Sequence, residues 1–185
     1  AWGDPQAAVM VTSYQLEGAA AASRPVCFAF NGGPGSASIW LHLGALGPKR
    51  VVVPDDGSMP VGPYSISDNP LSWFEHFDMV FIDPPHTGWS VSANEKARKR
   101  MLGVDGDVDA LAEVMRVWLT RHQRWGSAVY LAGESYGTTR GAALADKLHV
   151  SITVVESLLN SLRDRKLIEY DGMEGRAYVV RPTEA

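Results

Sequence analysis

The sequence predicts an α/β fold, in which a largely parallel sheet is covered by helices on both faces. Apolar segments of strand length recur along the chain, and a long helical segment separates the last two of them. Strands are expected at residues 8–16, 26–30, 51–53, 79–82 and 128–132, helices at 39–46 and 105–124, and turns over 54–70. This alternation is typical of parallel sheets, because each connection between parallel strands lays a helix on one face.

The longest expected helix has an apolar side and an acidic start. Its apolar positions recur three or four residues apart and comprise Val108, Leu111, Ala112, Met115, Trp118 and Leu119. Three acids at its start, Asp105, Asp107 and Asp109, have the spacing that opens a calcium-binding loop. Such a loop needs glycine where Ala110 stands and glutamate where Arg116 stands. The acids are therefore interpreted as stabilising a helix N-terminus, and no metal or other cofactor is expected.

A serine flanked by glycines follows the last expected strand. Ser135 is the centre of G-E-S-Y-G at residues 133–137, between the apolar run 128–132 and a segment with helical character. G-x-S-x-G between a strand and a helix predicts a nucleophile elbow, a tight turn that lifts the serine hydroxyl above the carboxyl end of the strand. Ser135 is therefore the candidate nucleophile.

A second glycine-rich turn follows the expected strand at residues 26–30. It reads N-G-G-P-G over residues 31–35, upstream of the elbow. In hydrolases with a nucleophile elbow, a turn in this place supplies a backbone amide to the oxyanion hole. Glycine lets the backbone approach a reacting carbonyl, and proline stiffens the turn.

Three ordered motifs resemble the signature blocks of the serine carboxypeptidases, a family of the α/β-hydrolase superfamily. They are N-G-G-P-G-S at residues 31–36, F-I-D-P-P-H-T-G-W-S at residues 81–90 and G-E-S-Y-G at residues 133–137. Shorter family motifs at residues 46–48, 62–64 and 69–73 occur in the same order, and the resemblance extends from about residue 9 to residue 148. It implies an incomplete α/β-hydrolase fold. The strand before the elbow would then be an edge, so we expect marginal stability.

The resemblance implies a serine-type peptidase that releases C-terminal residues. Ser135 would form an acyl-enzyme. The backbone amides of Gly33 and Tyr136 would hold the tetrahedral oxyanion. Ser36 stands where secreted eukaryotic members often have a disulfide cysteine, which favours a bacterial-type member.

The resemblance also implies a binding site for the C-terminus of a peptide or protein. Asn31, Gly32 and Glu134 would bind the free α-carboxylate of the substrate. A glutamate can bind a carboxylate only if the two share a proton, and this predicts an acidic pH optimum. The alternative is that Glu134 only stabilises the N-terminus of the helix that follows it.

The chain offers no evident base for this nucleophile. Hydrolases of this fold carry their acid and histidine after the serine, and the only histidine after Ser135 is His149. At 1.5 Å per helical residue, His149 is expected roughly 20 Å away and cannot be the base. His86 lies in a motif and is either a surrogate base or a loop residue facing water. We expect a truncated serine carboxypeptidase or an inactive peptide-binding fragment, and the first residue, Ala1, favours an incomplete amino end.

The last part of the chain has a different character. Residues 1–148 are assigned to the partial hydrolase domain and residues 149–185 to a tail of a helix and a hairpin. Apolar residues at helical spacing precede two strand-like segments, 167–170 and 177–180. This tail resembles the second half of a winged helix-turn-helix, which implies contact with DNA or protein. Acids are mixed among its basic residues, so nucleic-acid binding is not favoured.

Composition narrows the class of protein further. Hydrophobic residues make up 45% of the chain, which suits a folded core, and the net charge of -4 argues against a dedicated nucleic-acid binder. No apolar stretch approaches the roughly 20 residues of a membrane span. Cys27 is the only cysteine and is expected to be buried. The oligomeric state stays open, and so does the location, which would be secreted or periplasmic if the parent protein carried a signal peptide.

Overall fold

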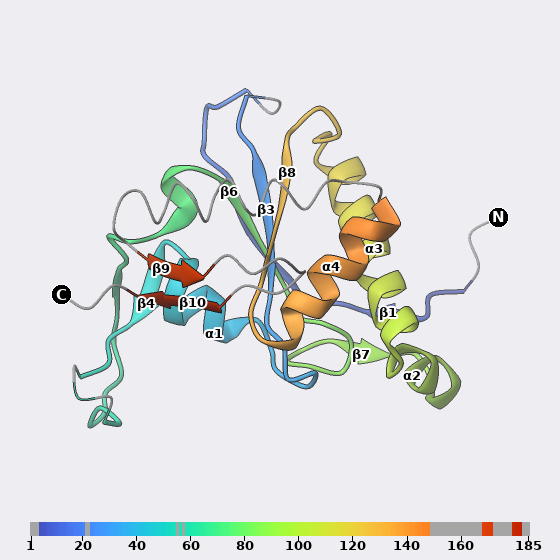
Figure 1. Cartoon of the computed structure of the whole chain (residues 1–185), viewed down its shortest axis with the longest axis horizontal. Coiled ribbons are helices and arrows are strands. Elements are labelled where there is room, and N and C mark those ends of the chain that lie inside the picture. The colour runs from blue at the N-terminus through green and yellow to red at the C-terminus, as the bar shows by residue number, and fades with distance from the viewer. Residues whose placement is uncertain are drawn as a thin grey trace.

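A four-stranded mixed sheet forms the centre of the molecule (Figure 1). The computed structural model describes residues 4–20, 23–54, 56 and 58–148, together with the backbone of residues 168–171 and 179–182. The strand order is β2 (Val11–Tyr14), β6 (Asp78–Ile82), β3 (Val26–Phe30) and β8 (Val129–Gly133). β6, β3 and β8 are parallel, and β2 runs antiparallel to β6. The predicted α/β class is confirmed, with one antiparallel strand in the sheet.

Helices cover both faces of this sheet, as the sequence predicts. On one face, Val26, Phe28 and Phe30 of β3 belong to a core cluster with apolar residues of α3 (Val104–Arg121) and α4 (Tyr136–Leu148). In Figure 1 these two helices lie side by side. On the other face, the alternate residues of β3 pack with side chains of α1 (Ile39–Leu41), the π-helical turn η1 (His42–Leu46) and the 3-10 turn η2 (Trp73–Glu75).

The remaining elements are short. β1 (Ala7–Ala8) pairs with β7 (Val91–Ser92), and β4 (Lys49–Val51) pairs with β5 (Ile66–Asp68). The strand predicted at 51–53 therefore begins and ends two residues earlier. Helix α2 (Glu95–Met101) was not predicted, because it has one buried residue, Ala97, and therefore no apolar stripe.

The predicted hairpin near the C-terminus is confirmed in its backbone. β9 (Ile168–Asp171) and β10 (Val179–Pro182) pair antiparallel, one or two residues later than predicted. The helix predicted before them lies outside the described residues, and so does His149. The winged-helix assignment of the tail and the boundary at residue 148 stay predictions. Among the helices that the structure describes, none is long and apolar enough to cross a bilayer.

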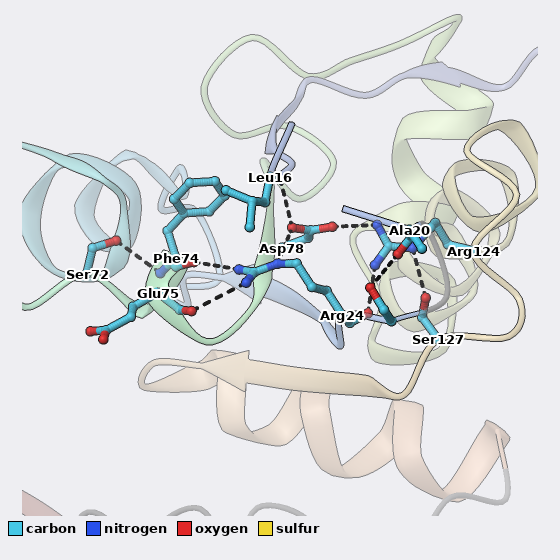
Figure 2. A network of polar contacts seen from close by, with 10 residues as sticks. Leu16, Ala20, Arg24, Ser72, Phe74, Glu75, Asp78, Arg124 and Ser127 are labelled. Atoms are coloured by element: carbon cyan, nitrogen blue, oxygen red, sulfur yellow. Dashed lines mark hydrogen bonds and ion pairs between the residues drawn. The ribbon is translucent and has the colours of Figure 1, made fainter. Parts of the chain in front are cut away.

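A buried polar network ties together the amino ends of the parallel strands (Figure 2). Asp78, the first residue of β6, accepts hydrogen bonds from Arg24, Arg124 and the amide of Leu16 at 3.0, 2.5 and 3.1 Å. Arg124 also donates to the carbonyl of Arg24 and the hydroxyl of Ser127. Burial raises the pKa of the Asp78 carboxyl, but these donors outweigh it and hold that pKa below its ordinary value. The network fixes the end of the sheet opposite the carboxyl ends of β3 and β8.

Candidate active site

Ser135 lies in a strained turn between β8 and α4. Its φ angle is 56°, in the left-handed region that residues other than glycine rarely adopt. A Cβ added to Gly133 would lie 2.1 Å from the carbonyl oxygen of Gly137, and one added to Gly137 would lie 2.7 Å from that of Phe30. No side chain fits at either glycine, so the turn has the backbone geometry that the G-x-S-x-G motif predicts. The Ser135 residue itself is exposed.

The turn after β3 lies directly against this elbow. A Cβ added to Gly32 would lie 2.5 Å from the amide nitrogen of Tyr136 and 2.6 Å from the carbonyl oxygen of Glu134. Gly33 has a φ of 107°, which glycine adopts without strain. Tyr136 is the first residue of α4, so its N–H has no acceptor within the helix. The turn that follows β3 at Gly32 and Gly33 therefore lies against the elbow of Ser135 and Tyr136, which follows the neighbouring strand β8.

Asn31 and Glu134 meet beside the elbow. Nδ2 of the buried Asn31 donates to Oε2 of Glu134 at 3.1 Å. Its Oδ1 accepts from the amide of Leu41 at 3.0 Å, and its own amide donates to Oγ of Ser38 at 3.3 Å. These contacts leave the Asn31 side chain a single orientation. Glu134 is exposed, and its second carboxylate oxygen has no protein donor among the described residues.

The 81–90 motif supports the segment that follows the turn. Asp83 Oδ1 accepts from the amide of Ser38 at 2.8 Å, and Oδ2 accepts from the amide of Trp89 at 3.4 Å. A cavity of about 310 Å³ lies between this motif, β2 and α1, with Asp83, His42 and Trp89 in its wall. Burial lowers the pKa of His42, and the negative charge of Asp83 opposes that shift. The His42 ring stacks on Phe81.

None of the histidines in the described part of the chain hydrogen-bonds to Ser135. His42 Nε2 shares a hydrogen bond of 2.7 Å with the hydroxyl of Tyr14, and His86 Nε2 shares one of 3.2 Å with that of Ser92. His86 is half-buried and hydrogen-bonds to Ser92 rather than to Ser135, so its contacts give no support to a role as a surrogate base. Among the described residues no cluster of His, Cys, Asp and Glu could hold a metal ion.

A buried ion pair behind the elbow was missed by sequence reasoning. Asp107 lies in the first turn of α3, where an acid was expected to stabilise the helix, and it also pairs with Arg140 of α4. Both residues are buried. The only signal in the sequence was a single arginine in the otherwise uncharged first part of α4, and its partner cannot be named without the tertiary fold.

Together, the turn at Ser135 and the adjoining glycine turn match the backbone arrangement expected of an α/β hydrolase. A model of the family "Serine carboxypeptidase" matches residues 11–160 of this chain. The chain therefore belongs to the serine carboxypeptidase family. The match ends twelve residues after the boundary expected at residue 148, inside the segment that the structure does not describe.

Two relatives each match a little over two thirds of this chain. This chain is 32% identical over 127 residues to the pheromone-processing carboxypeptidase KEX1 of Yarrowia lipolytica. The aligned region covers 68% of this chain and 19% of the relative. This chain is 30% identical over 130 residues to serine carboxypeptidase-like 33 of Arabidopsis thaliana. That aligned region covers 69% of this chain and 25% of the relative. The chain thus matches about a fifth to a quarter of the length of these relatives.

Proposed function

We propose that this chain carries the nucleophile and oxyanion hole of a serine-type carboxypeptidase. Ser135 is the nucleophile, and the amides of Gly33 and Tyr136 are the oxyanion donors. The observation that carries the proposal is the strained φ of Ser135 in an elbow whose following amide lies against Gly32. Strain of this kind persists where the surrounding structure over-determines it, which is common at active sites.

The substrate proposed for this site is the C-terminus of a peptide. Asn31, Gly32 and Glu134 bind its free α-carboxylate, and hydrolysis releases the terminal residue. The hydrogen bond from Asn31 to Glu134 supports this assignment, because it leaves the second oxygen of Glu134 available to share a proton with a bound carboxylate. Binding then takes up a proton, so it weakens as the pH rises.

The chain on its own is proposed to bind peptides but to hydrolyse them only slowly. No described histidine contacts Ser135, and the acid and base of the triad are expected to follow the nucleophile in a protein of this fold. Where no acid and base reach the serine, the oxyanion hole and binding still leave a residual acceleration of about 10³–10⁴ over water. A second candidate function, peptide binding without turnover, is favoured by the same observation.

The test is the binding of one fluorescent peptide in two forms, with a free and with an amidated C-terminus. The free acid should bind at pH 5 and more weakly at pH 8, whereas the amide should bind poorly at both. Glu134→Gln should reduce the dependence on pH, because an amide donates to a carboxylate at any pH. Glu75→Gln, at an exposed position in η2, serves as the matched control and should bind as the parent does. Equal binding of the free acid and the amide would rule out the carboxylate site.

A further inference from the structure

One buried guanidinium contacts the glycine turn from behind. Arg140 lies in α4 and is 2% exposed. Its Nη1 donates to the carbonyl oxygen of Asn31 at 2.6 Å and, over a longer distance of 3.4 Å, to that of Gly32. Its Nη2 donates to the carbonyl oxygen of Pro34 at 3.0 Å. A single side chain therefore holds three carbonyl groups of a four-residue turn.

The position of this guanidinium is fixed from two other sides. Its Nε donates to Oδ2 of Asp107 at 2.5 Å, and the buried carboxylate supplies the countercharge that a buried cation requires. Its Cζ lies 4.9 Å from the centre of the Tyr136 ring, within the range of a cation–π contact. Arg140 thus contacts both segments from which the oxyanion donors are proposed to come.

The carbonyl contacts determine where the amides of the turn point. The Gly32 carbonyl and the Gly33 N–H belong to one trans peptide group, because only the bonds before Pro34 and Pro63 are cis in the described chain. In a planar trans peptide the C=O and N–H point in opposite directions. The Gly32 oxygen accepts from the Ser36 amide at 3.1 Å and from Nη1 of Arg140 at 3.4 Å, so the Gly33 N–H points away from both donors. The shorter bond to Asn31 fixes the preceding peptide group, and the bond to Pro34 fixes the peptide group between residues 34 and 35.

We propose that Arg140 is a positioning residue of the oxyanion hole, with Asp107 holding its guanidinium in place. It contacts no reacting atom, and its role is to fix the peptide planes of residues 31–34 so that the Gly33 amide is presented beside that of Tyr136. This inference rests on the proposed function. Lysine cannot replace arginine here, because one ammonium group cannot reproduce the planar set of donors that meets three carbonyls and a carboxylate.

The first test is hydrogen exchange of the peptide that covers residues 31–36, measured by mass spectrometry. Arg124 offers a matched control, because it is an equally buried arginine paired with Asp78 at the opposite end of the sheet. Arg140→Lys should raise the exchange rate of residues 31–36 at least about tenfold, through local opening of the turn, whereas Arg124→Lys should leave it unchanged. Unchanged exchange in a folded Arg140→Lys variant would overturn the proposal.

The second test is the rate of covalent labelling of Ser135 by a fluorophosphonate. Arg140→Lys should lower the limiting rate constant at least about tenfold without changing the half-saturating concentration, because a displaced amide weakens the transition state rather than binding. Labelling at the parent rate would overturn the proposal. An unlabelled parent chain would count against the nucleophile instead, and the exchange of residues 31–36 would then decide the role of Arg140. If Arg140→Lys fails to fold, Asp107→Asn should give the same changes in both measurements.

Discussion

Replacing Asp78 by asparagine should remove a large share of the stability of the fold. Arg124 and Asp78 form an ion pair whose side chains are 1% and 4% exposed, and Arg24 donates to the same carboxylate. Removing one partner of a buried pair leaves an uncompensated charge and costs about 3–5 kcal/mol. Asparagine keeps one acceptor oxygen, so we expect a loss near the lower limit, about 3 kcal/mol. A domain of this size is stabilised by only about 5–15 kcal/mol in total.

Urea denaturation followed by circular dichroism measures this loss, with Asp68→Asn as the control. Asp68 pairs with Lys49 at the surface, where the side chains are 87% and 54% exposed, so the same substitution there should cost about 0–1 kcal/mol. The pKa of Asp78 is depressed in the folded state, so its contribution is present above the ordinary carboxyl pKa and is lost as the pH falls through the folded value. Asp78→Asn should therefore flatten the acid limb of the stability curve. Equal stability of Asp78→Asn and Asp68→Asn at pH 7 would contradict the stabilising role of the buried ion pair.

Three further predictions follow from other parts of the fold. Gly137→Ala should lower the melting temperature and cost about 1–3 kcal/mol of stability, because the new Cβ would lie 2.7 Å from the backbone of Phe30. Gly141→Ala lies in the same helix with open space around it, so it should stabilise the fold by about 0.5–1 kcal/mol. Burial raises the pKa of the Cys27 thiol to about 12, so a thiol reagent should react with it in urea and not in the native protein; rapid native labelling would contradict its burial. Burial lowers the pKa of His42 in the folded state, so its contribution to stability should be lost as the pH falls below about 6.5. His42→Gln should therefore reduce the change in unfolding free energy between pH 7 and pH 5. An unaltered change between these two pH values would contradict this prediction.

The elements that sequence reasoning located well are those whose side chains are buried. β3 coincides with the predicted range, and β6, β8 and α3 begin or end within three residues of it, because uninterrupted apolar runs and an apolar stripe mark buried strands and a covering helix. Helix α2 and strand β5 were not predicted, because few of their residues are buried. Strand β5 also depends on pairing with β4, which lies more than ten residues earlier.

Only the part of the candidate site that lies in the two glycine motifs could be predicted from the sequence. Two glycine motifs at the carboxyl ends of parallel strands must lie close when those strands are neighbours, and β3 and β8 are neighbours. The contacts of Arg140 with residues 31–34 link positions more than a hundred residues apart and have no local sequence signal. Asp83 follows the neighbouring strand β6 and supports Ser38, 45 positions earlier, again without a local signal. These supporting contacts emerge only from the fold.

Intact-mass analysis after incubation with a fluorophosphonate shows whether Ser135 is a reactive nucleophile. The parent chain and Ser135→Ala are compared, and the labelled peptide is then mapped. We expect a single adduct on Ser135, formed slowly because no described histidine hydrogen-bonds to that serine, and no adduct on Ser135→Ala. An adduct of equal yield on Ser135→Ala, or none on the folded parent chain after prolonged incubation, would contradict the assignment of Ser135 as the nucleophile.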